Sequence, residues 1–202
     1  FTEISSSACP FFVRYGAITD QQDPIDEAVL QIKVHAKHLQ DPETGLFRHV
    51  WHESPDFYPA SSYWGRAVGW ATTGLVDTLV ELPNDHPERE AVADILRDAV
   101  AGAVEHQDNS GFWRQRVDDP RSPLEASGTL MLAYTLKRGV DEGFLDERYE
   151  SPAQDAIDAC KGIVSEEGAV RRIARPPASA FAPLGTTAYG QGWFLLAANC
   201  FL

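Results

Sequence analysis

The sequence predicts an all-α protein built from helical hairpins. Apolar residues recur at intervals of three and four along most of the chain, which is the period of an amphipathic helix. Turns rich in Gly, Pro and Asp separate these segments, and no stretch shows strong strand periodicity or an alternation of strands with helices. We expect about seven helices in a single domain that spans residues 1–202.

The first two expected helices lie before residue 41. One runs from about residue 4 to residue 15, where Gly16 is a plausible stop, although Pro10 implies a kink or a late start. The other opens with Asp23-Pro24, an acidic N-cap followed by proline at the first helical position. The turn at residues 41–45 ends it.

The remaining helices are predicted from the same kinds of signal. The third begins near Ser61 or Ser62 and runs to Leu82, and the last, residues 193–202, is apolar nearly all round, which predicts burial. Residues 168–175 alternate weakly and favour either a hairpin strand or an extended loop. The intervening helices are expected at about residues 87–107, 124–138 and 151–164, and the small residues at 126–128 permit close helix contact.

The charge of the chain excludes several partners. Asp and Glu number 30 against 17 Lys and Arg, a net charge of −13, which repels nucleic acid and anionic membranes. No apolar run is long enough to cross a bilayer, and no signal peptide is evident. Cys9, Cys160 and Cys200 lie far apart beside apolar residues, which favours reduced thiols and a cytoplasmic protein.

An acidic, lysine-poor surface also suits a high-salt cytoplasm, where self-repulsion is screened. A halophilic source is therefore a hypothesis. Unfolding followed against salt concentration tests it, and a stability that does not rise with salt would contradict it.

Two adjoining stretches, residues 45–54 and 63–70, concentrate the chemistry of the chain. They place three Trp, two His, two Arg and a Glu in a Gly- and Pro-punctuated loop and the first turns of a helix. Such a mixture favours a concave site with aromatic walls and polar groups. The alternative is a packed core in which each His is simply hydrogen-bonded.

A coarse repeat extends this pattern. Loops that open with glycine and carry aromatic or polar residues recur at 45–54, 111–115 and 168–172, roughly two helices apart. Loops that recur at one end of stacked helical hairpins line the same face, so we expect a site to be assembled there.

Several motifs in order along the chain resemble those of the unsaturated uronyl hydrolases, glycoside hydrolase families 88 and 105. They are the segments Ala8–Phe12, Asp41–Leu46, His49-x-Trp51-x-Glu53-Ser54, Tyr63–Trp70, Gln107–Gln115, Glu125–Gly128 and Tyr189–Gly192. The resemblance implies an (α/α)6 barrel-like toroid. It also implies an oligosaccharide substrate with a terminal 4,5-unsaturated uronic acid, to whose double bond the enzyme adds water after protonating the enol ether.

The same resemblance assigns the catalytic positions. The family's catalytic aspartate falls at His52, and its assisting aspartate has Glu3 as the nearest carboxylate of this chain. Both positions depart from the family pattern. An imidazole still exchanges protons near neutrality, and the adjacent Glu53 is a further candidate for the acid.

The substrate-binding candidates combine stacking and polar groups. Aromatic walls bind a sugar, and a guanidinium, imidazole or amide binds its carboxylate or hydroxyls. The candidates are His49, Trp51, Trp64, Arg66, Trp70, Trp113 and Gln115, with Arg114 as an addition. The alternative for each Trp is a place in the core. The alternative for Arg66 is an ion pair with a neighbouring acid. No metal-ligand spacing and no phosphate loop occurs, so we expect neither a metal nor a cofactor.

The length leaves two function classes open. A closed toroid of this family has twelve helices, so this chain matches only its middle and C-terminal part. A preceding segment, an associated partner or second copy, and a divergent short protein each explain this. The chain is then either a hydrolase or a non-catalytic carbohydrate-binding scaffold. Convergence of Glu3, His52 and Trp51 on one pocket would favour the hydrolase.

Overall fold

The structure is a computed structural model that describes residues 1–59, 62–176, 179 and 181–202. It confirms the all-α class. The number of helices differs from the expected seven because the first expected helix is split in two. The helices of this described part are α1 (Glu3–Ser7), α2 (Cys9–Thr19), α3 (Gln22–Leu39), α4 (Gly65–Glu81), α5 (Arg89–Val104), α6 (Ala126–Asp141), α7 (Glu150–Lys161) and α8 (Ala188–Asn199).

Two small antiparallel sheets accompany the helices. Strand β1 (Trp113–Arg114) pairs with β2 (Leu124–Glu125), and β3 (Ile173–Ala174) pairs with β4 (Leu184–Gly185). A short 3-10 helix, η1 (Glu147–Tyr149), precedes α7. Of the two alternatives for residues 168–175, the hairpin strand is therefore confirmed at β3.

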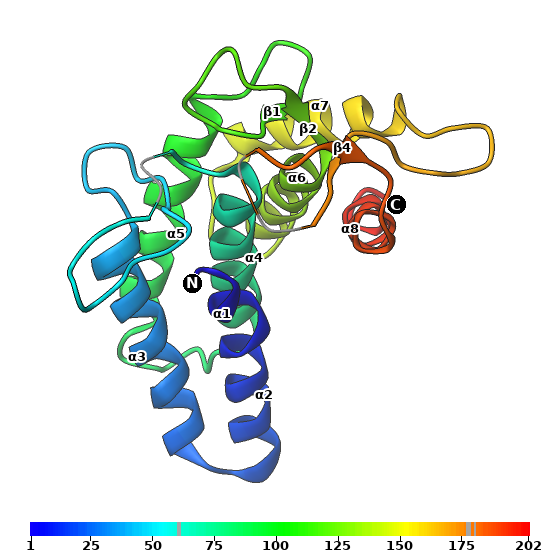
Figure 1. Cartoon of the computed structure of the whole chain (residues 1–202). Helices are drawn as coiled ribbons and strands as arrows, with labels where there is room; N and C mark the ends of the chain where they lie inside the picture. The colour runs from blue at the N-terminus through cyan, green and yellow to red at the C-terminus, as the bar shows by residue number, and fades with distance from the viewer. Residues whose placement is uncertain (60–61, 177–178, 180) are drawn as a thin grey trace.

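The helices form an arc of hairpins in two rows. In one row α1 and α2, then α4, α6 and α8, contact one another in that order. In the other row α3 packs on α2, α5 on α4 and α7 on α6, so each outer helix follows its inner partner along the chain (Figure 1). The incomplete helical toroid expected from the sequence is thereby observed.

Glycine residues, which have no side chain, allow the inner helices to approach closely. A Cβ at Gly128 of α6 would lie 2.8 Å from the carbonyl carbon of Gly65, and one at Gly74 of α4 would lie 2.3 Å from the carbonyl oxygen of Ser5. Both distances are shorter than real Cβ contacts, so glycine is required where α1, α4 and α6 meet. The predicted close contact at residues 126–128 is confirmed.

The first predicted helix differs in two respects. It breaks at Ala8, and Pro10 lies in the first turn of α2, where its missing N–H costs nothing. Gly16 does not stop the helix, which continues to Thr19 and ends at Asp20 with a left-handed backbone (φ 55°). Gly16 is instead a packing residue, because a Cβ there would lie 2.6 Å from both Gln21 and Ile25.

The start of α4 is also later than expected. Ser61 lies outside the described residues, and Ser62 precedes the helix, which begins at Gly65. The reason is tertiary, because the Gly65 N–H donates to the Gln115 carbonyl and Val117 N–H to the Tyr63 carbonyl. This pairing holds residues 63–65 extended until the helix begins.

The burial predicted for the last helix is wrong. Leu195 and Leu196 of α8 are 69% and 53% exposed, because α8 packs on α6 and α7 and has no further described neighbour on its other side. At the opposite end of the arc, Phe11, Ile18 and Leu30 of α2 and α3 are exposed as well. In the described part of the chain, no helix combines the length and apolarity needed to span a bilayer.

Candidate active site

The loops gather at one end of the helical arc (Figure 1). Trp64 and Arg116 face each other in an antiparallel bridge, which joins the segments around residues 63 and 116. The Gln115 side chain donates to the Ala182 carbonyl, and the Ala126 N–H donates to the Arg172 carbonyl. The expectation that these loops line one face is confirmed.

A cluster of side chains forms where the inner helices begin. Glu3 is the first residue of α1, Arg66 the second of α4, Ser127 the second of α6 and Tyr189 the second of α8. Because these four helices all start at the loop end, their first turns meet. The positive ends of the longer helix dipoles, those of α4, α6 and α8, therefore point toward the same place and favour an anionic ligand.

Arg66 links three of these helices. Its Nη1 donates to the Ser127 hydroxyl at 3.3 Å, the Ala174 carbonyl at 2.8 Å and the Tyr189 hydroxyl at 2.8 Å. The guanidinium lies 4.2 Å from the Trp64 ring centroid, and a second ring, that of Tyr189, is 5.1 Å away. The side chain is only 5% exposed, so its position is set by these hydrogen bonds and ring contacts.

The charge of Arg66 has no direct ion-pair partner among the described residues. All of its hydrogen-bond acceptors are neutral oxygens, so the alternative of an ion pair with a neighbouring acid is not what the structure shows. Burial lowers the pKa of the guanidinium, while the Tyr189, Glu125 and Glu3 side chains act in the opposite direction. A guanidinium stays protonated in proteins, so this pocket holds a positive charge that a ligand carboxylate can neutralise.

Glu125 has a structural role beside it. As the N-cap of α6, its side chain accepts hydrogen bonds from the Ser127 and Gly128 N–H groups and from the Ser127 hydroxyl. It also accepts from the Ala174 N–H at 2.8 Å. Glu125 thereby fixes β3 against α6 and holds the Ala174 carbonyl under Arg66.

Glu3 and His49 form a hydrogen-bonded pair at the other side of the pocket. The His49 Nε2 lies 2.8 Å from the Glu3 Oε1, and the imidazole ring is 4.7 Å from the Trp64 ring. Burial is the largest influence and acts to raise the pKa of the Glu3 carboxyl, but the hydrogen bond from His49, a backbone hydrogen bond and nearby electrostatic interactions together outweigh it, so the net pKa is below its ordinary value. An ionised carboxylate only accepts, so Nε2 of His49 holds the proton.

Two polar atoms of this cluster are buried without a hydrogen-bond partner among the described residues. They are the Glu3 Oε2 and the indole Nε1 of Trp64. Unsatisfied buried groups of this kind are uncommon and concentrate at functional sites. One is an acceptor and the other a donor, as a bound hydroxyl or water requires.

Trp70 continues the aromatic wall one turn further along α4. Its ring meets Trp193 of α8 edge to face at 5.7 Å, and Trp193 contacts Tyr134 of α6 in the same way. Trp70 and Trp193 are partly buried. The predicted aromatic wall is thus shared between α4, α6 and α8.

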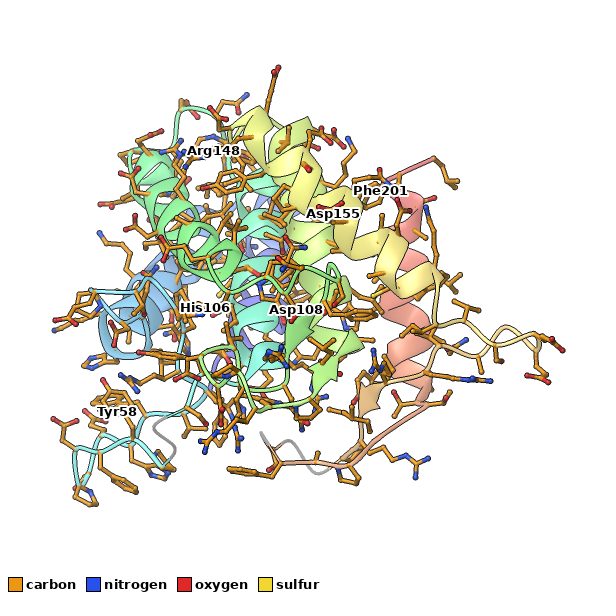
Figure 2. The ribbon with its side chains drawn as sticks, turned by 90° about the horizontal axis from the view of Figure 1, so that it is seen from above. Tyr58, His106, Asp108, Arg148, Asp155 and Phe201 are labelled. Atoms are coloured by element: carbon orange, nitrogen blue, oxygen red, sulfur yellow. The ribbon has the colours of Figure 1, made fainter. Side chains whose placement is uncertain are left out.

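The segment at residues 51–57 lies apart from these residues. Trp51 stacks on His38 at 3.8 Å, and His52 pairs with Phe57 in an isolated bridge and stacks on its ring. His52 and Glu53 are exposed. Figure 2 shows Tyr58, the residue after Phe57, on a loop that reaches away from the helices. Glu3, Trp51 and His52 therefore share no recorded contact in the described residues.

Three other candidates support the fold around the site. Trp113 is fully buried and its indole N–H donates to the Ala103 carbonyl, which leaves no ring surface for a sugar. Gln115 is 2% exposed and holds the loop at Ser179 and Ala182. Arg114 pairs with Asp108 at 2.6 Å.

Sequence reasoning did not include Ser127 and Tyr189 among the site residues. Both lie inside segments that carried the family resemblance, Glu125–Gly128 and Tyr189–Gly192. The signal that could have found them is their place one residue into a helix. Arg66 occupies the same place in α4, and helix starts share one end of such a fold.

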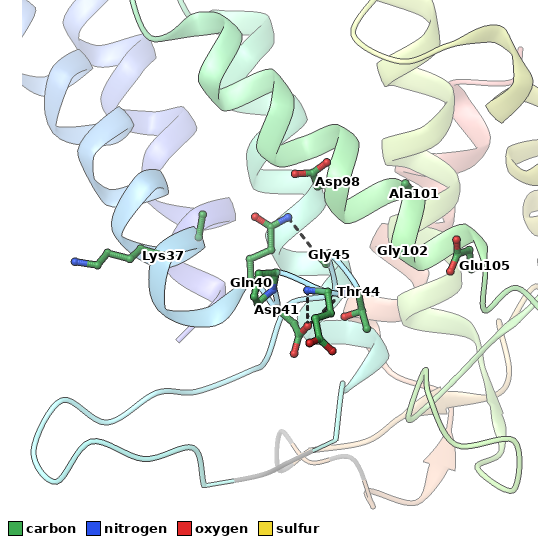
Figure 3. A pocket seen from close by; sticks show the side chains of 12 residues that line it. Lys37, Gln40, Asp41, Thr44, Gly45, Asp98, Ala101, Gly102 and Glu105 are labelled. Atoms are coloured by element: carbon green, nitrogen blue, oxygen red, sulfur yellow. Dashed lines mark hydrogen bonds between the residues drawn. The ribbon is translucent and has the colours of Figure 1, made fainter.

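A second hollow, of about 580 Å³, lies between the outer helices α3 and α5 and the turn at residues 40–45. In Figure 3, Asp41, Asp98 and Glu105 border it, and Lys37 is the one basic residue labelled. The Asp41 carboxylate accepts from the N–H groups of Glu43 and Thr44, so it serves the turn. The acidic lining repels an anionic sugar, so the pocket at Arg66 fits a uronate better.

Helical hairpins in an arc, with aromatic side chains and a buried guanidinium where the inner helices begin, define a helical-toroid scaffold. The chain belongs to Glycosyl Hydrolase Family 88, whose family model matches residues 7–200. The family predicted from the sequence motifs is confirmed.

Known relatives agree with this assignment. The unsaturated rhamnogalacturonyl hydrolase YesR of Bacillus subtilis (strain 168) is 32% identical over 163 residues, which cover 81% of this chain and 46% of that protein. An unsaturated 3S-rhamnoglycuronyl hydrolase of Formosa agariphila is 28% identical over 206 residues, covering 95% and 54%. A solved glycoside hydrolase from family 105 of C. acetobutylicum superposes with a TM-score of 0.91 at 26% identity, covering all of this chain and 64% of that one.

The chain spans about half the length of the curated relatives it matches. The open apolar faces of α8 and of α2 and α3 lie at the two ends of the arc.

Proposed function

We propose that this protein hydrates the 4,5-double bond of a terminal unsaturated uronic acid in lyase-generated oligosaccharides. The observation that supports this most is the Arg66 guanidinium, buried among neutral oxygens, beside the Glu3–His49 pair. One group suits an anion, and the other suits proton transfer. An unsaturated uronic acid carries a carboxylate next to the carbon that must receive water.

Substrate binding uses charge and ring surface together. Arg66 pairs with the uronate carboxylate, and the dipoles of α4, α6 and α8 add to the positive potential there. Trp70, which is partly buried one turn further along α4, contacts the ring of the sugar. Because Arg66 contacts the Trp64 ring and donates to the Tyr189 hydroxyl, it is preorganised and loses little freedom on binding.

Proton transfer falls to Glu3 and His49. Water adds its oxygen to C5 and gives its proton to Oε2 of Glu3, while the pair returns one proton to C4, so the double bond is lost and one water is consumed. The hemiketal that forms then falls apart and releases the neighbouring sugar. His52, at the family's aspartate position, lies on the exposed turn and takes no part in this scheme.

The same proposal includes a cytoplasmic location and a substrate of pectin-like or glycosaminoglycan-like origin. Three free cysteines, two of them buried, suit a reducing compartment.

The test follows the near-ultraviolet absorbance of unsaturated uronides, which hydration removes. The purified protein is mixed with a panel of lyase-generated unsaturated disaccharides, and Glu3→Gln, Arg66→Lys and His52→Ala are compared with the wild type. Loss of absorbance that requires Glu3 and Arg66 supports the proposal. Binding without any loss of absorbance contradicts it.

A second candidate is a carbohydrate-binding homologue without catalysis. The observation that favours it is the exposure of His52 and Glu53 on a turn whose contacts do not include Glu3. In that case ligand addition shifts the tryptophan fluorescence of the protein while the absorbance of the unsaturated sugar persists.

A further inference from the structure

Glu125 is a buried carboxylate that has no direct ion-pair partner in the described part of the chain. The side chain is 2% exposed, and its hydrogen bonds come from the N–H groups of Ser127, Gly128 and Ala174 and from the Ser127 hydroxyl. Because each of these neutral groups donates, neither carboxylate oxygen carries a proton. A buried charge is costly unless an opposite charge compensates for it. The opposite charge in this network is Arg66.

Two bridges join the Glu125 carboxylate to the Arg66 guanidinium. The Ser127 hydroxyl donates its proton to Oε1 of Glu125 at 2.6 Å, so its oxygen is left to accept from Nη1 of Arg66 at 3.3 Å. Ala174 forms the other bridge with its backbone. Its N–H donates to Oε1 of Glu125 at 2.8 Å, and its carbonyl accepts from Nη1 of Arg66 at 2.8 Å. Both bridging residues are fully buried, and chained hydrogen bonds reinforce one another in such surroundings.

The bridges determine which edge of the guanidinium is occupied. The hydrogen bonds of Arg66 to Ser127, Ala174 and Tyr189 all use Nη1. The Tyr189 hydroxyl itself donates to the Ala174 carbonyl, so it depends on the same bridge. Nε and Nη2 have no recorded acceptor within the residues that the structure describes. Together they form an edge that binds a carboxylate through two parallel hydrogen bonds.

The residue type at position 125 agrees with a role beyond capping. Helix N-caps prefer the short side chains of Ser, Thr, Asp and Asn. Glu125 is longer by one methylene than Asp. With this length one carboxylate caps α6 at Ser127 and Gly128 and also reaches Ala174 of β3. The contact with β3 couples the cap to Arg66, because the Ala174 carbonyl accepts from the guanidinium.

We propose that Glu125 is a positioning residue of the candidate active site, which holds the Arg66 guanidinium in one orientation through Ser127 and Ala174. The inference rests on the proposed function for the identity of the anion, a uronate carboxylate, that Nε and Nη2 of Arg66 bind. Glu125 does not touch this anion. It acts on affinity through Arg66 and leaves the proton-transfer pair unchanged.

Two substitutions break the bridges while they keep the cap of α6. Ser127→Ala removes the hydroxyl but retains the N–H that donates to Glu125. Glu125→Asp keeps the charge and is a preferred cap, but its shorter side chain withdraws from Ala174. Asp146→Ala removes the exposed N-cap of η1 and controls for a general loss of stability. Thermal unfolding verifies that each variant folds.

The binding test compares the methyl glycoside of 4,5-unsaturated glucuronic acid with its uncharged amide. Calorimetry gives the dissociation constants, and absorbance kinetics give KM and kcat for the glycoside. Ser127→Ala and Glu125→Asp should each raise the dissociation constant and KM of the glycoside by about three- to tenfold, the usual effect of one hydrogen bond, while kcat stays within about twofold. The affinity for the amide, which offers Arg66 no charge, should change by less than about twofold. In an Arg66→Lys background neither substitution should have a further effect, because both act through the guanidinium.

Nitrogen NMR of the guanidinium tests the orientation without any ligand. The signals of Arg66 are assigned by their loss in Arg66→Lys. In the wild type, the hydrogen bonds at Nη1 should slow the rotation that exchanges Nη1 with Nη2. Ser127→Ala and Glu125→Asp should speed this exchange, and Asp146→Ala should not.

The outcomes separate this inference from the proposed function. Unchanged nitrogen exchange in both bridge variants, equal losses of affinity for the glycoside and the amide, or effects that add to that of Arg66→Lys overturn the inference. Faster exchange in the variants, when the wild type does not bind the glycoside or binds it without any loss of absorbance, supports the positioning role and overturns the proposed hydration. Hydration by the wild type with a KM that neither bridge variant changes does the reverse.

Discussion

Two regions of this protein carry acid–base residues, and their surroundings differ. Glu3 and His49 lie at the start of the inner helices, hydrogen-bonded to each other at 2.8 Å and flanked by Trp64. His52 and Glu53 lie on an exposed turn, where the His52 ring stacks on Phe57. His49 and His52 are three residues apart in an irregular segment, yet only His49 is directed toward the helices.

The difference shows that position in a motif does not by itself make a catalytic group. Proton transfer needs a group held within hydrogen-bond reach of the reacting atom, with its pKa set by its neighbours. The Glu3–His49 pair has a partner, a depressed Glu3 pKa and an unpaired oxygen. His52 and Glu53, by contrast, are exposed to solvent on their turn.

Replacing Glu3 by Gln has the largest expected effect. The amide keeps an oxygen that accepts from His49, so the fold is retained, but it cannot take a proton. The rate of hydration falls by about 10²–10⁴-fold, the usual contribution of general acid–base catalysis. Absorbance kinetics measure the rate and thermal unfolding verifies the fold. Glu27→Gln, on the exposed side of α3, is the matched control. A fully active Glu3→Gln protein would show that the Glu3–His49 pair does not carry out the proton transfer.

Replacing Arg66 by Lys comes next. Lysine keeps the charge but presents a single ammonium, which does not match a carboxylate with two parallel hydrogen bonds. The dissociation constant for an unsaturated uronide should rise by roughly 10- to 100-fold, because one charge-assisted hydrogen bond is worth about 1.5–3 kcal/mol. Calorimetry gives the constant, with Arg14→Lys of α2 as the control. Unchanged affinity would show that Arg66 does not bind the uronate carboxylate.

Asp41 lies in the turn that precedes both His49 and His52, so replacing it tests what stabilises that turn. The Tyr63 hydroxyl, together with the Glu43 and Thr44 N–H groups and Arg48, lowers the pKa of Asp41 from 3.8 to about 2. The folded pKa is the lower one, so this stabilisation is fully present above about pH 4 and is lost as pH falls toward 2. Asp41→Asn should cost about 1–2 kcal/mol at neutral pH, allowing for solvent screening.

Denaturant unfolding between pH 2 and pH 7 measures the effect of that substitution. The stability of Asp41→Asn should vary less with pH at the acid end than that of the wild type. Asp155→Asn, on the exposed side of α7, serves as the control. Parallel curves for the wild type and Asp41→Asn would show that the carboxylate contributes nothing through its charge.

His52→Ala has the smallest expected effect. The side chain is exposed and its recorded contacts are with Phe57, so hydration rates should stay within about twofold of the wild type, as for most surface substitutions. The same absorbance assay measures it. A loss as large as that of Glu3→Gln would reverse the comparison and make His52 the acid that its motif position implies.

Local sequence signals determined most of the helices. The stripe of apolar residues after Asp23-Pro24 predicted α3, and the small residues at 126–128 predicted a close contact that Gly128 makes with Gly65. These features depend on spacing and side-chain size within one segment, which a sequence displays directly. The family followed from short motifs for the same reason.

The site was only partly predictable. His49, Trp64, Arg66 and Glu3 were expected and the structure brings them into one series of contacts. Trp113, also expected there, is a core residue, because an aromatic in a loop has the same local signature whether it faces a ligand or the interior. Exposure depends on what packs against the loop from elsewhere.

By itself, the sequence determined the helical class, the family and the residue types that a uronate site requires. Only the tertiary structure decided that Ser127 and Tyr189 meet Arg66 and that α8 leaves its leucines open. The reason is that the first outcome rests on contacts between residues more than sixty positions apart, and the second on which helices pack against α8. Such contacts depend on how the helices are arranged, and local periodicity carries no record of that arrangement.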